Sequence, residues 1–247
     1  MTDLAIKWVH GSMDKSEFEA LMDKYFFFFK CRHTKECTKE EYQKTADTLY
    51  VDKVQSRIND LKQLPQYKNI EALLSSIGDV NIDSIVSRYL SLKDKIEAKN
   101  NYRPEMVIGH GDPCFANALY NKSTQMLKFI DPKGASVESD LWTNPYYDVA
   151  KLSHSVCGKY DFFNNGLFDI RIAEDFTYDL EIPFDNSEYM QIFKSKVEEN
   201  GFDYLTVRIY EASLFMSMLP LHIDNPHKVL GFILNADRIL KEIELDV

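Results

Sequence analysis

The stretch from Val107 to Ala135, VIGHGDPCFANALYNKSTQMLKFIDPKGA, sets polar side chains between apolar runs. The segments NALYN and MLKFID have the composition of strands, and the four residues 122–125 between them are a typical hairpin connection. Four polar residues flank these runs: His110, Asp112, Asn117 and Asp131. The sequence therefore predicts a small β-hairpin at 105–135 that carries a reactive group of side chains.

These residue types suit one kind of chemistry. A carboxylate at a strand end, such as Asp112, can accept or orient a hydroxyl proton. The amide oxygen of Asn117 and the carboxylate of Asp131 are ligands of the kind that Mg²⁺ binds, together with phosphate oxygens and water. One base and two metal ligands are the minimum for phosphoryl transfer, which depends mostly on positioning and charge neutralisation.

The motif HGDPCFAN, followed by FIDP, resembles the H-G-D-x-x-x-x-N and I-D motifs of the aminoglycoside phosphotransferase and choline kinase family. These are small-molecule kinases with the protein-kinase-like fold. The tract YYDVAKLSHS at 146–155 is similar to the Asp-containing helix start that follows in that family. The resemblance implies ATP and Mg²⁺ as cofactors and a small-molecule hydroxyl as the acceptor.

The resemblance also implies a role for each matching residue. Asp112 is the expected catalytic base, and Asn117 and Asp131 are the expected Mg²⁺ ligands. His110 is expected to support the loop, and Asp148 to brace it by accepting hydrogen bonds. Two local alternatives remain open, since Asp148 could only cap its own helix and Asp131 could stand in a plain turn.

The remainder of the chain predicts helices, so the expected class is α+β and mostly helical: a kinase-like large (C-terminal) lobe with a small catalytic β-hairpin. Phe18, Leu21, Met22, Tyr25 and Phe29 fall on one face of a helix, and Thr38-x-x-Glu41 is a capping box that opens another. The expected parts of this single lobe, 1–247, are a hinge-like segment at 1–12, helices at 13–100, the catalytic hairpin at 105–135, and helices at 145–247 with a small hairpin at 167–182.

A kinase of this family also has a small N-terminal β lobe with a phosphate-covering loop and a nucleotide lysine. Before His110 the glycines are Gly11, Gly78 and Gly109, so no glycine-rich loop is present. LAIKWV at 4–9 matches the lysine-bearing strand only superficially, because three residues precede it. We expect this lobe to be absent, which leaves three explanations: a fragment, a short form completed by another chain, or a non-catalytic relative.

Charge and composition argue against two classes of partner, nucleic acids and membranes. The formal charge of −10 argues against nucleic acid, because phosphate binding needs clustered Lys and Arg. The longest apolar run, YFFFF at 25–29, is too short for a membrane span, and residues 1–11 lack the apolar core of a signal peptide. We therefore expect a cytoplasmic protein with no membrane or nucleic-acid partner.

The resulting hypothesis is a phosphotransferase lobe that acts on a sugar, an amino alcohol or an aminoglycoside. A sugar-type acceptor is preferred, since sequences of this kind occur in capsule and surface-polysaccharide pathways, and residues 211–226 are the expected wall of its pocket. The alternative is a non-catalytic kinase-like binding or regulatory module. A third hypothesis is a metal-dependent hydrolase that uses Asp112 and Asp131.

Overall fold

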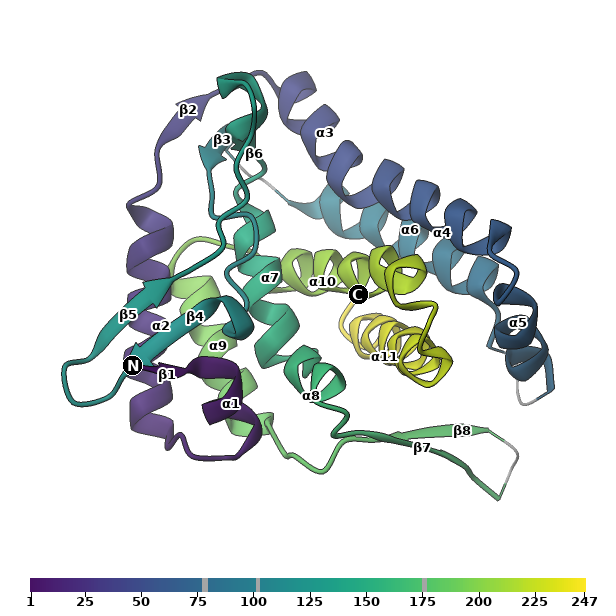
Figure 1. Ribbon diagram of the computed structural model, residues 1–247. Helices are drawn as coiled ribbons and strands as arrows, with labels where there is room; N and C mark the ends of the chain where they lie inside the picture. Colours follow the sequence, from purple (N-terminus) through teal and green to yellow (C-terminus); the bar gives the residue numbers. More distant parts are fainter. Residues whose placement is uncertain (77–79, 101–102, 175–176) are drawn as a thin grey trace. The chain divides into compact units, whose positions relative to one another are not determined.

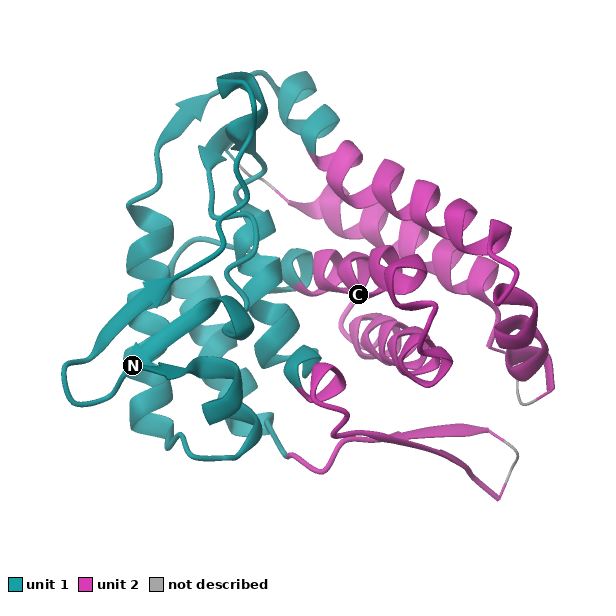
Figure 2. Ribbon diagram, viewed as in Figure 1, with its two compact units in different colours: residues 1–45, 101–161, 185–207 teal, residues 46–100, 162–184, 208–247 magenta. Residues whose placement is uncertain are grey.

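The computed structural model describes residues 1–76, 80–100, 103–174 and 177–247. Over these residues the chain is mostly helical with small antiparallel sheets, which confirms the predicted α+β class (Figure 1). The chain divides into two compact units, coloured separately in Figure 2. Unit 1 comprises residues 1–45, 101–161 and 185–207, and unit 2 comprises residues 46–100, 162–184 and 208–247.

The helices and strands follow the predicted order with several additions. The α-helices are α1 (Leu4–Val9), α2 (Lys15–Lys30), α3 (Lys39–Asp47), α4 (Lys53–Gln63), α5 (Tyr67–Ser76), α6 (Ile82–Lys99), α7 (Tyr146–Val156), α8 (Tyr160–Asn164), α9 (Ser187–Glu199), α10 (Tyr204–Met218) and α11 (Pro226–Glu244). The strands are β1 (Thr2–Asp3), β2 (Thr34–Glu36), β3 (Glu105–Ile108), β4 (Ala118–Asn121), β5 (Met126–Phe129), β6 (Trp142–Thr143), β7 (Asp169–Ile172) and β8 (Tyr178–Glu181).

Unit 1 holds two small sheets. β4 and β5 form the predicted hairpin, with Ala118 opposite Phe129, and β1 pairs with the other edge of β4. In the second sheet β3 lies between β2 and β6, and Val107 faces Thr34 on one side and Thr143 on the other. The end of β3 and the start of β4 thus flank the polar loop that the sequence singles out.

The helix α2 has the predicted buried face. Asp14 is its N-cap and accepts a hydrogen bond from the backbone N–H of Glu17 at 2.8 Å. The helix packs against α9. Of the aromatic run that follows Tyr25, Phe26 is buried whereas Phe27 is 69% exposed. The residues predicted to line the stripe are all buried: Phe18, Leu21, Met22, Tyr25 and Phe29.

One prediction about the first hundred residues needs correction. Residues 34–36 form strand β2 instead of continuing a helical region, because β3 supplies a pairing partner far along the chain. Within the segment expected to be hinge-like, LAIKWV at 4–9 forms helix α1, which Asp3 caps by accepting from the N–H of Ile6, so the match to the lysine-bearing strand is superficial, as expected.

The capping box at Thr38 is confirmed. Thr38 Oγ1 accepts from the N–H of Glu41 at 3.1 Å, and Glu41 Oε2 accepts from the N–H of Thr38 at 2.8 Å. The long helix that follows is interrupted by a π-helical segment, Thr48–Asp52, between α3 and α4. The wider turn shifts the buried face, so Tyr50 is buried while Leu49 is only half-buried.

Unit 2 is built around helix packing. Within it α11 packs against α6 and β8. The rings of Tyr50 and Tyr210 stack with centroids 3.6 Å apart, and the Tyr89 hydroxyl donates to the Tyr50 carbonyl at 2.7 Å. β7 pairs with β8 as an antiparallel hairpin in the region where the sequence predicts one. No helix of the described residues combines the length and apolar character needed to cross a bilayer.

Candidate active site

The loop between β3 and β4 is held from behind by Asp148, in the first turn of α7. Its carboxylate accepts hydrogen bonds from the backbone N–H of His110 at 3.0 Å and of Gly111 at 2.8 Å. The side chain of Asp148 is completely buried. A buried carboxylate that accepts hydrogen bonds from two backbone N–H groups fixes the loop. Asp148 therefore does more than stand in the first turn of α7.

Arg32 neutralises Asp148. Its Nη1 lies 3.2 Å from Asp148 Oδ2, and its other nitrogens donate to the carbonyls of Phe29 at 3.0 Å and Pro145 at 3.2 Å. The Arg32 side chain is only 3% exposed. Arg32 was not among the residues predicted from the sequence, and no local signal points to it, because it lies 116 residues from its partner.

Two glycines allow the loop to approach its neighbours. A Cβ atom on Gly109 would lie 2.6 Å from Asp148 Oδ2. Gly111 has a φ of +83°, and a Cβ atom there would lie 2.7 Å from the Cβ of Lys133. Both positions therefore need glycine, the first for space and the second for backbone conformation as well.

We expect Gly109→Ala to destabilise the protein by about 1–3 kcal/mol, because the new methyl group displaces the carboxylate that fixes the loop. Gly134→Ala is the matched control, since a Cβ atom at Gly134 meets nothing within 4 Å. Thermal unfolding of both variants measures the difference. Equal melting temperatures for the two variants would contradict the close approach seen at Gly109.

Asp112 stands at the surface of this loop and pairs with Lys151 of α7. Lys151 Nζ lies 3.0 Å from Asp112 Oδ1, with 11% of the lysine side chain and 27% of the aspartate side chain exposed. Although burial opposes it, the nearby Tyr147 hydroxyl and Asp112 carboxylate raise the pKa of Lys151, so its ammonium stays charged. Asp112 is thus reachable from solvent and is paired with a cation that no sequence motif indicates.

Backbone hydrogen bonds bring Asn117 and Asp131 to the same loop. Asn117 Nδ2 donates to the Asp112 carbonyl at 3.0 Å, and the Asn117 carbonyl accepts from Ile130 N–H at 2.9 Å. The N–H of Lys133 donates to the His110 carbonyl at 2.8 Å. Asp131 is therefore bracketed by two contacts, one to each end of the loop that carries Asp112.

Asp131 also has an unusual backbone. Its φ is +57°, in the left-handed region that costs most side chains about 1–2 kcal/mol and that Asp and Asn tolerate best. Its side chain is exposed, and among the described residues its carboxylate forms no hydrogen bond or ion pair. Non-glycine residues with strained backbone are concentrated at functional sites, and Asp131 has both this backbone and an exposed carboxylate.

His110 is buried, and its contacts stabilise the loop. Its Nδ1 accepts from the N–H of Asp112 at 3.2 Å, which assigns the ring proton to Nε2. Its ring lies 5.5 Å from that of Phe129 on β5. Both contacts are internal to the protein, so His110 has a structural role in the loop.

Below the loop, Phe115 N–H donates to Ser155 Oγ at 3.0 Å, and the carboxyl group of Asp161 is buried nearby. Burial raises the pKa of Asp161 to about 7. Burial, together with the charges of Asp112 and Asp161, also raises the pKa of the Cys114 thiol to about 12. Cys114 is therefore protonated at neutral pH and is not a nucleophile.

Neither Lys7 as a nucleotide-binding lysine nor a metal cluster made only of protein side chains is supported by the contacts of the described residues. Lys7 lies on α1 and forms an ion pair with Glu17, so it is already neutralised. Within residues 1–76, 80–100, 103–174 and 177–247, no three His, Cys, Asp or Glu side chains converge as a metal cluster. A metal at the loop would therefore rely on Asp131, on the amide of Asn117 and on oxygens from outside the protein.

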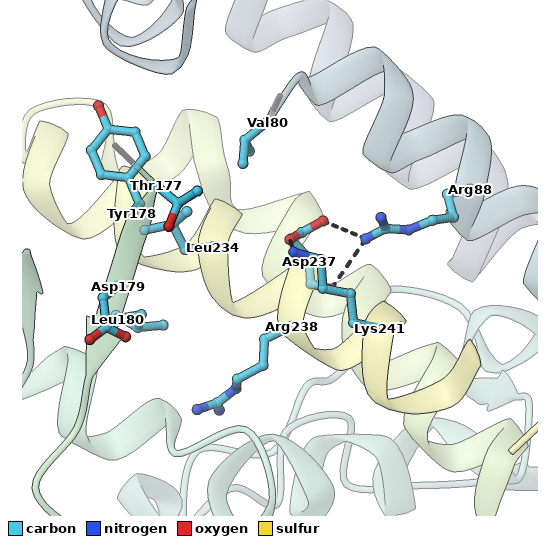
Figure 3. A pocket seen from close by; sticks show the side chains of 10 residues that line it. All are labelled: Val80, Arg88, Thr177, Tyr178, Asp179, Leu180, Leu234, Asp237, Arg238 and Lys241. Carbon is cyan, nitrogen blue, oxygen red and sulfur yellow. Dashed lines mark hydrogen bonds and ion pairs between the residues drawn. The ribbon is translucent and has the colours of Figure 1, made fainter. Parts of the chain in front are cut away.

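Unit 2 contains a separate cavity of about 530 Å³, between the β7–β8 hairpin and α11. Figure 3 shows Arg88 reaching from α6 to Asp237 on α11. Lys241 pairs with the same carboxylate at 2.9 Å, and Arg238 Nε lies 3.7 Å from Glu242. The cations that line this cavity are already matched by carboxylates, and residues 211–226, the predicted acceptor wall, are not part of its lining.

No protein-family model matches the chain, and neither the curated proteins nor the solved structures give a match. The function is therefore inferred from the chemistry and placement of the residues themselves.

Proposed function

We propose that the loop of unit 1 carries the catalytic residues of an ATP- and Mg²⁺-dependent phosphotransferase that phosphorylates a hydroxyl group of a small molecule. The observation that carries this proposal is the bracketing of Asp131 by backbone contacts to Asn117 and His110, at the loop that presents Asp112. One base and two oxygen ligands for a hard cation are thereby held on rigid backbone.

Asp112 is the residue proposed to receive the acceptor. Its carboxylate accepts a hydrogen bond from the acceptor hydroxyl and orients the oxygen for attack on the terminal phosphate. The contacts that hold the loop favour this role, because Asp148 fixes the backbone directly before Asp112. The acceptor classes that we propose are those predicted from the sequence, with a sugar of a capsule or surface-polysaccharide pathway preferred.

The residues present fit a magnesium ion. The amide nitrogen of Asn117 is used by the Asp112 carbonyl, which leaves its Oδ1 as a ligand, and the carboxylate of Asp131 is exposed. When bound there, Mg²⁺ neutralises and orients the phosphate oxygens of ATP. Asn117 and Asp131 would hold it, and the phosphates and water would complete its coordination.

The proposal predicts different effects for the two acidic residues. Asp112→Asn should lower the turnover number about 10²- to 10⁴-fold and leave the affinity for Mg·ATP within about twofold. Asp131→Asn should weaken Mg·ATP binding by at least about tenfold. Asparagine is the suitable replacement at position 131 because it tolerates the left-handed backbone.

Calorimetric titration with Mg·ATP and an assay of ADP formation with choline, glucosamine and kanamycin measure both quantities. Asp169→Asn, at an exposed position on β7, is the control and should change neither. Equal losses of turnover and affinity in both site variants would contradict the assigned roles. Phosphate release without an acceptor, abolished by Asp131→Asn, would instead support a hydrolase.

A second candidate function is a binding or regulatory module without turnover. It is favoured by the ion pair between Lys7 and Glu17, which occupies the one lysine that the sequence offered for the nucleotide phosphates. Failure of the chain to bind Mg·ATP in the same titration would favour this module over the enzyme.

A further inference from the structure

We propose that Lys151 is a positioning residue that fixes the Asp112 carboxylate with one oxygen directed to the acceptor, a role that rests on the proposed phosphotransferase function. A buried lysine lies directly behind the proposed base. Its Nζ lies 3.0 Å from Asp112 Oδ1.

The two carboxylate oxygens of Asp112 are in different environments. Oδ1 is buried, while 27% of the side chain as a whole is exposed. The exposed part therefore belongs to the remaining atoms, and Oδ2 is the oxygen that an acceptor hydroxyl can reach. Without Lys151 the carboxylate could rotate, and the two oxygens would exchange places.

Burying the lysine is costly unless it is paired. Its side chain is 11% exposed and belongs to α7, whose residues are all buried. Taking an ammonium group out of water costs several kcal/mol, which an ion pair with a nearby carboxylate can offset. Asp112 supplies that carboxylate, so the pair is held together by the burial of Lys151.

Helix α7 then controls the loop through two residues of opposite charge. Asp148 and Lys151 are three positions apart and so lie on neighbouring points of one helix face. Asp148 binds the backbone at His110 and Gly111, and Lys151 binds the side chain of Asp112. One rigid helix thus sets both the path of the loop and the direction of its base.

The first test is a double-mutant cycle in the full chain, with Lys151→Met, Asp112→Asn and the double variant. Methionine keeps the apolar stem and removes the charge. We expect Lys151→Met to lower the turnover number about 10²-fold with the KM for Mg·ATP changed less than about twofold. In the Asp112→Asn background the same substitution should have no further effect, because Lys151 acts through Asp112.

The matched control is Lys93→Met in unit 2. Lys93 is also a buried lysine, 2% exposed, and pairs with Glu97 at 2.9 Å. Its removal should lower stability and leave the turnover number unchanged. A further loss of rate from Lys151→Met in the Asp112→Asn background would overturn the positioning role, since it would mean direct contact with substrate.

A second measurement does not depend on enzymatic activity. A paired, buried ammonium group exchanges its protons slowly and gives a lysine ¹H–¹⁵N NMR signal near pH 6. We expect the Lys151 signal in the wild-type chain and its loss in Asp112→Asn, while the Lys93 signal persists in both. Persistence of the Lys151 signal in Asp112→Asn would overturn the inference even if phosphotransfer is found, and its loss without any phosphotransfer would refute only the proposed function.

Discussion

Replacing Asp148 by alanine is expected to lower the free energy of unfolding by about 4 kcal/mol. The substitution leaves the Arg32 guanidinium buried without its anion, and removing one partner of a buried ion pair typically costs about 3–5 kcal/mol. It also leaves the backbone N–H groups of His110 and Gly111 without their acceptor. Both losses fall on the loop that carries Asp112, so stability and loop order should decline together.

Urea denaturation followed by tryptophan fluorescence measures this effect. The chain has two tryptophans, Trp8 and Trp142, and both belong to unit 1, so the signal reports the unit that contains Asp148. The control is Lys15→Ala, which removes an exposed ion pair with Glu188 and should cost less than about 1 kcal/mol. A cost below about 1 kcal/mol for Asp148→Ala would show that the buried network does not hold the loop.

Replacing Asp161 by asparagine is expected to remove a pH dependence from the stability of unit 1. Burial raises the pKa of Asp161 from 3.8 to about 7, so the folded protein keeps a proton that the unfolded chain releases. The stabilisation is fully present below about pH 4, where both states are protonated. It is lost as the pH rises from about 4 to about 7 and does not change further above that range.

The difference between these pKa values corresponds to about 4 kcal/mol. Asparagine cannot ionise, so the Asp161→Asn variant should gain up to about that much stability relative to wild type between pH 4 and pH 8. Unfolding free energies at pH 4, 6 and 8, measured by the same fluorescence, give the two slopes. Asp60→Asn, an exposed aspartate on α4, is the control and should keep the wild-type slope. Parallel curves for wild type and Asp161→Asn would show that Asp161 is ionised in the folded protein.

The parts of the fold that depend on neighbouring residues follow from the sequence. The capping box at Thr38 and Glu41, the buried stripe of α2 and the β4–β5 hairpin were all predictable, because each is set by residues within a few positions of one another. The spacing of Asp112 and Asn117 is local in the same sense. It predicts that Asp112 and Asn117 share one loop, and Asn117 Nδ2 donates to the Asp112 carbonyl there.

The surroundings of that loop depend instead on contacts between segments that are distant in the sequence. Arg32 meets Asp148 across 116 residues, and Thr34 of β2 pairs with Val107 of β3, which is also distant in the sequence, so no local pattern indicates either contact. Lys151 is an intermediate case, since its position on the same face of α7 as Asp148 was visible while its partner Asp112 was not. Spacing along the chain fixes which residues share a helix face or a turn, whereas the pairing of a buried charge depends on which distant segment packs against it.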